Sequence, residues 1–287
     1  MTMKHSDELI QTHPSLGIFR LAALSACSDG ALDEETLENM FEQVESGALA
    51  SLSPLDAWGE MRPGLMAQKP SNMLSALYAC GALQEVLPEV SALFGVPQIA
   101  DDPPQVDIGL HLLRVLDQAA SHNAPLSVRF SALVMNVGKS DSPPEHLPIH
   151  YRHVERGRPR IESICRRFAL PEDCLDLALL ALQECERVHR VSEVRAGPIA
   201  DMLERLDAFD NRKRFDLLMM LCACDFLAYG KQANYPKSAL LYDTLHACSG
   251  IDGKRMAQGF PQAEARDALR QARAAAIAKA LRSERWS

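Results

Sequence analysis

Two groups of arginines have the residue type and the spacing to hold phosphate groups. A guanidinium group donates paired hydrogen bonds to phosphate oxygens, so clustered arginines are candidates for contact with RNA. The first group fills one short stretch and the second repeats at i, i+4 and i+7: Arg152, Arg156, Arg158 and Arg160, then Arg266, Arg270 and Arg273. The alternative for the first group is a solvated loop in which the arginines pair with Glu145, Glu155 or Glu162.

Histidines and cysteines supply fewer candidates for a metal site. His150 and His153 are three residues apart and could share a helix face, but their segment reads as a loop that enters a helix. None of the eight cysteines forms a C-x-x-C pair, and most fall on apolar helical faces. We interpret them as small buried hydrophobic residues in a reducing cytoplasm. Cys222 and Cys224 diverge on a helix, which favours the core over ligation.

The overall charge limits the kind of nucleic-acid contact. The formal net charge is -8, which argues against a protein that coats nucleic acids without selectivity. Basic patches on an acidic chain are compatible with selective RNA binding, and also with solvated helix faces. The N-terminus mixes charged residues into its first ten positions, so it is not a secretory signal. The longest apolar run, about Leu217 to Cys224, is too short to span a bilayer. We therefore expect a cytoplasmic protein with no membrane partner.

The elements that must position these residues are helices. Apolar residues recur at helical spacing nearly everywhere, as between Val106 and Ala120, and few β-branched runs occur. The Ala-rich stretch Ala263 to Leu281 predicts a strong helix that carries the second arginine group. Gly95 to Pro104 reads as a linker and Ser140 to Pro148 as a loop. We predict an all-α protein with segments 1–100, 101–232 and 233–287.

Several short motifs occur in the order found in one enzyme family. The first three are Cys80-Gly81-Ala82-Leu83, Leu87-Pro88-Glu89 and Leu93-Phe94-Gly95-Val96-Pro97. They are followed by Asp107 to His111, by Gly138-Lys139, by Asn234-Tyr235-Pro236 and by Gly259-Phe260. From about residue 13 onward, this order resembles the bacterial CCA-adding tRNA nucleotidyltransferases. The resemblance implies neck and body helices, an HD phosphohydrolase-like domain and a C-terminal tail that contacts tRNA.

The same resemblance implies a degenerate metal site. An HD site takes a His, an adjacent His-Asp pair and a late Asp as ligands of a divalent metal. His111 and Asp225 match the outer two ligands, but Met135 and Asn136 stand at the pair, and Cys185 replaces a supporting His. His150 and His153 fit a later histidine-rich segment and are further possible ligands. We expect no cofactor. A divalent metal would bind only if these remaining ligands still form a site. His111 and Asp225 should then hydrogen-bond in a polar part of the core.

The nucleotide-adding groups of the family are also missing from the printed chain. The family's catalytic head carries an Asp-x-Asp metal pair, and no Asp-x-Asp occurs here. Only about a dozen residues precede the neck, so the chain reads as headless. His13-Pro14-Ser15-Leu16-Gly17 replaces the base-reading Glu-Asp-x-x-Arg motif, and Leu55-Asp56 replaces a Glu-Arg pair.

Two functions follow from these losses. The leading hypothesis is a non-catalytic relative, a pseudoenzyme that binds tRNA-like RNA or a protein partner. The alternative is a residual HD phosphohydrolase that acts on nucleotides or RNA ends. A relic without a function is the third possibility.

Overall fold

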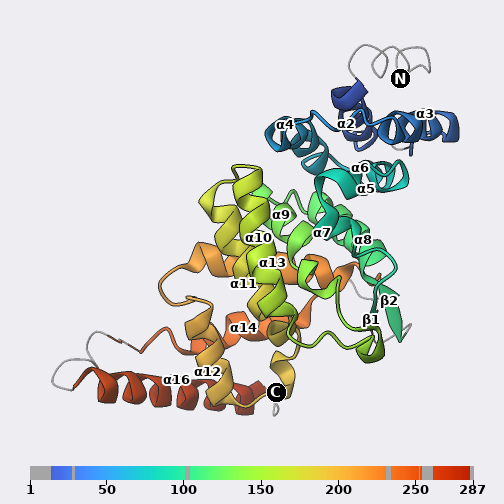
Figure 1. Cartoon of the computed structure of the whole chain (residues 1–287). Coiled ribbons are helices and arrows are strands. Elements are labelled where there is room, and N and C mark those ends of the chain that lie inside the picture. Colours follow the sequence, from blue (N-terminus) through green and yellow to red (C-terminus); the bar gives the residue numbers. More distant parts are fainter. Residues whose placement is uncertain are drawn as a thin grey trace. The chain divides into compact units, whose positions relative to one another are not determined.

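The computed structural model describes residues 14–27, 30–100, 104–230, 234–251, 253 and 261–284. Within these residues the chain forms two compact units (Figure 1). The first holds the described residues up to Leu182 together with 224–230, and the second holds 183–223 and the described residues from 234 onward. The segment boundaries predicted from the sequence, at residues 100 and 232, remain a prediction.

The predicted all-α class is confirmed. The first unit begins with helices α2 (Pro14–Ser25), α3 (Glu34–Glu45), α4 (Pro54–Leu65), α5 (Pro70–Ala79), α6 (Ala82–Val86) and α7 (Pro88–Ser91). It continues with α8 (Ile108–Ser121), α9 (Leu126–Val134), the 3₁₀ turns η1 (Val137–Lys139) and η2 (Pro144–His146), and α10 (His153–Arg167). Helices α11 (Glu172–His189) and α13 (Arg212–Leu227) contribute residues to both units.

The second unit contains the end of α11, the turn η3 (Val191–Glu193), α12 (Ala196–Arg205), the first part of α13, α14 (Pro236–Ala247) and α16 (Gln262–Glu284). Helices α12 and α14 pack against α16 (Figure 1). The helix expected between Ala263 and Leu281 is confirmed as α16. No helix in the described ranges is long and apolar enough to cross a membrane.

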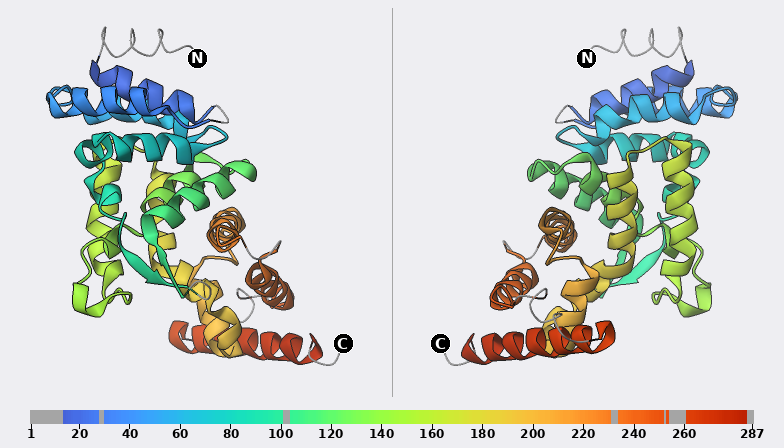
Figure 2. Two further views of the ribbon diagram at one scale, coloured as in Figure 1. Left: turned by 90° about the vertical axis from the view of Figure 1, so that its right-hand side faces the viewer. Right: turned by 90° about the vertical axis from the view of Figure 1, so that its left-hand side faces the viewer.

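The expected linker after Gly95 is partly a strand. Pro97–Ile99 (β1) pairs antiparallel with Gln105–Asp107 (β2), and this small ribbon is visible in Figure 2. Because β2 takes up residues through Asp107, the predicted helix starts at Ile108 rather than Val106. The Asp107 side chain then accepts hydrogen bonds from the backbone N–H groups of Leu110, at 2.8 Å, and Gly95. This cap holds the start of α8 next to Gly95, a few residues after α7.

Aromatic stacking joins α4 to α9 and to Phe168, directly after α10, inside the first unit. Trp58 of α4 stacks on Phe168, with ring centroids 5.3 Å apart, and meets the edge of Phe130 of α9. Arg129 is buried beside them and donates to three backbone carbonyls, those of Leu65, Ala67 and Ala124. Burial lowers the pKa of Arg129. Three bonds to carbonyl oxygens satisfy a cation that would otherwise be costly to bury.

Candidate functional site

His111 and Asp225 come together as the sequence analysis expected. His111 lies on the buried face of α8 with Ile108 and Leu112, and its side chain is fully buried. Its Nε2 hydrogen-bonds with Oδ1 of Asp225, on α13, at 2.9 Å. The ring of Tyr229 packs against the imidazole, with centroids 4.3 Å apart. The expected hydrogen bond between His111 and Asp225 is therefore confirmed.

The donors at this place do not fit a divalent metal. Nε2 of His111 already faces Asp225, and its Nδ1 is buried without a hydrogen-bond partner among the described residues. Met135 is buried just after α9, and a thioether is a poor ligand for hard or borderline cations. Asn136 follows it and offers only a neutral carbonyl oxygen. Within the described ranges, no group of three His, Cys, Asp or Glu side chains is arranged to hold a metal ion.

His150 and His153 hold the backbone between η2 and α10. The two ring nitrogens of His150 lie 2.8 Å from Ser142 Oγ and 3.0 Å from the carbonyl oxygen of Pro97. Nδ1 of His153 lies 2.9 Å from the carbonyl oxygen of His150. Because both nitrogens of His150 are engaged, this imidazole connects the loop to strand β1.

Helix α10 lies directly on the turn η1. A side chain at Gly138 would place its Cβ 1.9 Å from the carbonyl oxygen of His153 and 2.7 Å from the backbone nitrogen of Gly157. The neighbouring Lys139 is buried, and its Nζ donates to Oε1 of Gln98 at 3.2 Å. The segment after α9 is thus fixed from both sides, by α10 and by β1.

The first arginine group divides into two kinds. Arg156 donates to the carbonyl oxygens of Gly138 and Tyr151 and pairs with Asp141. Arg160 donates to the carbonyl oxygen of Val137 and binds both carboxylate oxygens of Asp141, at 3.1 and 2.7 Å. These two arginines act as internal braces. The sequence did not point to Asp141, because its partners Arg156 and Arg160 lie 15 and 19 positions later in the chain.

The other two arginines of this group are more exposed. Arg152 pairs with Glu155 and Arg158 pairs with Glu162, two of the acidic partners that the sequence analysis weighed. Both pairs lie on the surface of α10 at i, i+3 and i, i+4 spacing. Pairs of this kind are weak and exchange readily with water or another anion.

The second arginine group runs along α16. Arg266 is exposed, and Arg270 is about half exposed with its Nε 3.7 Å from Oδ1 of Asp201. Arg273 instead lies over the ring of Phe209, 3.6 Å from its centroid. The start of the predicted stripe is therefore open to solvent, while Arg273 also packs against the second unit's own core.

The sequence was compared with those of known proteins. No protein-family model matches the chain. It is 39% identical over 280 residues to the multifunctional CCA protein of Cupriavidus necator and covers 68% of that protein. It is 39% identical over 289 residues to the one of Chromobacterium violaceum and covers 70% of it. The chain belongs to the CCA-adding tRNA nucleotidyltransferase family.

Another relative shows how much of these proteins the chain represents. The multifunctional CCA protein of Paraburkholderia phymatum is 40% identical over 269 residues, 92% of this chain and 64% of that protein. The chain thus spans about two thirds of the length of the CCA proteins it matches. Of the family motifs used in the sequence analysis, His13 and Gly259-Phe260 lie outside the described residues.

Two further family positions have structural roles here. Cys185, in place of the supporting His, has its Sγ 3.4 Å from Sγ of Cys222, and both are buried. Asp56, in place of the Arg of the Glu-Arg pair, lies in the first turn of α4 and accepts from the Ser53 hydroxyl at 2.7 Å.

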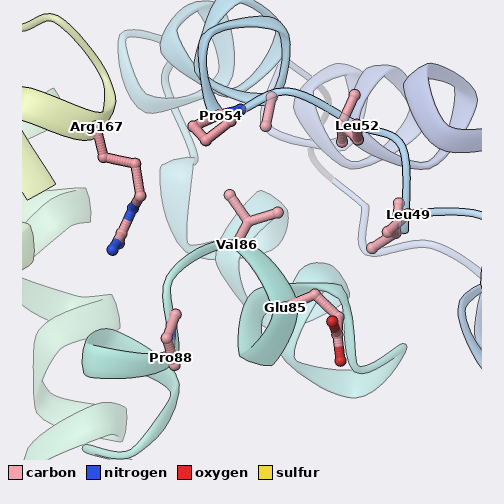
Figure 3. A pocket seen from close by; sticks show the side chains of 8 residues that line it. Leu49, Leu52, Pro54, Glu85, Val86, Pro88 and Arg167 are labelled. Atoms are coloured by element: carbon pink, nitrogen blue, oxygen red, sulfur yellow. The ribbon is translucent and has the colours of Figure 1, made fainter.

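A small pocket of mixed polarity lies beside the start of α4. Its volume is about 160 Å³, and its lining is Leu49, Leu52, Pro54, Ala57, Glu85, Val86, Pro88 and Arg167. Figure 3 shows Arg167 on one side and Leu49 and Glu85 on the other. Arg167 donates two hydrogen bonds to Glu89, at 3.0 and 2.9 Å. Glu89 thus neutralises Arg167, whose buried Nε has no hydrogen-bond partner among the described residues.

Proposed function

We propose that this chain binds structured RNA of the tRNA class and performs neither nucleotide addition nor phosphate hydrolysis with its own side chains. Membership of the CCA-adding family supports RNA as the partner. The observation that carries the proposal is the exposed start of the α16 arginine stripe, at Arg266 and Arg270. Cations on one helix face can follow a phosphate backbone, while the net charge of -8 disfavours loose binding elsewhere.

The printed chain lacks the metal-binding side chains that either reaction would need. Nucleotide addition needs paired carboxylates that hold metal ions, and the printed chain has no Asp-x-Asp. Hydrolysis at an HD site needs several anionic or imidazole ligands, and Met135 and Asn136 replace the central pair. We expect no labelled CTP or ATP to be added to tRNA lacking its 3′ end. Incorporation above a control without the protein would refute this part of the proposal.

The RNA contact can be tested with charge-matched variants on one helix. Arg266→Glu and Lys279→Glu each change the charge by the same amount, and glutamate is a good helix former. Lys279 is 13 residues further on, about 220° around the helix, so it faces away from the stripe. Arg273 is left unchanged because its guanidinium packs on Phe209.

The measurement is a filter-binding titration against tRNA at low and physiological salt. We expect the single variant Arg266→Glu to weaken binding clearly more than its charge-matched control Lys279→Glu, which should change it less than twofold. Arg266→Glu together with Arg270→Glu should weaken binding at least tenfold. Equal binding by wild type and the double variant would contradict the assignment to α16. No binding by wild type at low salt would refute RNA as the partner and favour a protein.

A residual phosphohydrolase is the second candidate, and the retained contact between His111 and Asp225 favours it. Its test is hydrolysis of a generic phosphodiester with added divalent transition metal, alongside the metal content of the dialysed protein. We expect background rates and well below one equivalent of metal. Activity that disappears in Asp225→Asn would establish this candidate instead.

A further inference from the structure

The loop of residues 146–152, between η2 and α10, presents an aromatic ring and a cation to solvent. Its sequence, His-Leu-Pro-Ile-His-Tyr-Arg, contains no acidic residue. Tyr151 is 57% exposed and Ile149 is 45% exposed, and the side chain of Arg152 is 76% exposed. The edge of the His146 ring meets Tyr151, with centroids 5.3 Å apart. Exposed aromatic rings beside arginines are the usual means of holding single-stranded nucleotides.

The backbone beneath these exposed side chains is fixed. Nη1 of Arg156 donates to the carbonyl oxygen of Tyr151 at 2.8 Å, and His150 contacts Ser142 and Pro97. The carbonyl oxygen of His150 accepts from His153. Inward-facing groups thus anchor the loop while Tyr151 points outward. A ring carried on a fixed backbone loses less entropy on stacking than a ring on a mobile loop.

Arg152 also adopts an uncommon backbone conformation. Its φ is 57° and its ψ is 22°, in the left-handed region that glycine would occupy with less strain. Arg152 is the N-cap residue of α10 and its carbonyl oxygen accepts a hydrogen bond from the N–H group of Arg156, but this backbone role does not require a cationic side chain. Arg152 contributes one ion pair, to the exposed Glu155, which does not account for a cation at this position.

The surrounding charges favour a nucleotide over an apolar partner. Asp141 is paired with Arg156 and Arg160, and Glu155 with Arg152, so two of the three acidic groups close to the loop are matched by cations, while Glu145, directly before the loop, is exposed. The exposed large apolar side chains of the loop are Tyr151 and Ile149, and Pro143 and Pro144 before it are also exposed. We infer that this loop contacts an unpaired nucleotide of structured RNA, with Tyr151 stacking on the base and Arg152 meeting the adjoining phosphate. This inference rests on the proposed RNA-binding function.

The test compares two RNA hairpins with the same stem, one blunt and one with four unpaired 3′ nucleotides. Tyr151→Ala should weaken binding of the tailed hairpin by on the order of tenfold to a hundredfold, as expected for loss of one stacked base. Binding of the blunt hairpin should stay within twofold. Tyr151→Phe keeps a ring and should retain wild-type affinity for both. Tyr78→Ala is the matched control, because Tyr78 is also exposed, at 43%, but stacks on Phe94.

The outcomes separate this inference from the proposed function. If wild type binds neither hairpin, both fail. If wild type binds the tailed hairpin and Tyr151→Ala binds it equally well, RNA binding stands and the loop contact is refuted. An equal loss on both hairpins also refutes a contact with an unpaired base. Circular dichroism and thermal unfolding of each variant, with Tyr151→Phe as a folded reference, exclude misfolding as the cause of a loss.

Discussion

Asp141 illustrates how a single residue can hold a loop through two arginines. Burial would raise the pKa of its carboxyl group, but hydrogen bonds and charge from Arg160, with help from Arg156, outweigh burial and lower it. A lowered folded-state pKa contributes stability above the unfolded value, about 3.9, and this contribution is lost as the pH falls through the folded pKa. The loop after η1 should therefore be sensitive to acid.

We predict that Asp141→Asn destabilises the protein at pH 7 by up to about 1 kcal/mol, since the carboxylate is half exposed and partly screened. The difference from wild type should shrink toward pH 3.5. Urea unfolding at both pH values measures it. Glu162→Gln removes a more open pair and should cost little at either pH. A loss for Asp141→Asn that is the same at pH 7 and pH 3.5 would show that charge is not its cause.

A second residue-scale prediction concerns the metal position. Met135→His together with Asn136→Asp should raise the content of divalent metal after dialysis from well below one equivalent toward one. The reason is that His111 and Asp225 would then complete four ligands of the kind that metals need. Adding Asp225→Asn to the double variant should lower the metal content again. No gain in the double variant would mean that α9 does not present these residues as the family resemblance implies.

At the scale of elements, the contact between α10 and η1 positions both the loop and the internal arginines. Gly138 meets backbone atoms, which cannot move aside. Gly157 differs, because a Cβ there would meet the Leu182 methyl groups at 2.8 and 3.1 Å, and a side-chain end can rotate. Gly138 and Gly157, in one interface, should therefore differ in how well each tolerates substitution by alanine.

We predict that Gly138→Ala destabilises the protein by about 3 kcal/mol or more, since it forces the helix off the turn. Gly157→Ala should cost much less, because alanine is also the better helix former. Thermal or urea unfolding compares the two. Similar losses for both variants would contradict the close approach of Gly138 to α10.

At the scale of the whole molecule, RNA binding must overcome a net charge of -8. Binding through about six phosphate contacts should weaken on the order of a thousandfold between 50 and 200 mM salt. The slope of affinity against salt should fall in Arg266→Glu and stay unchanged in Lys279→Glu. A titration over four salt concentrations measures the slope, and a flat slope in wild type would indicate recognition without phosphates.

Local patterns in the sequence were sufficient to predict where the main helices lie. The spacing of apolar residues predicted α8 because one buried face produces that spacing wherever the helix lies, and the Ala-rich composition predicted α16. The resemblance to a family also paired His111 with Asp225, 114 positions apart. The start of α8 was misplaced by two residues, since pairing of β2 with a strand several residues earlier determined it.

The roles of the arginines were decided by tertiary structure alone. Arg152, Arg156, Arg158 and Arg160 look alike in sequence, yet two brace carbonyl oxygens and Asp141 while two lie exposed. The same holds for Tyr151, whose exposure depends on His150 reaching Pro97, 53 positions earlier. Helix periodicity is a property of neighbouring residues, whereas the partner of a long polar side chain depends on which distant segments the fold brings within hydrogen-bonding distance.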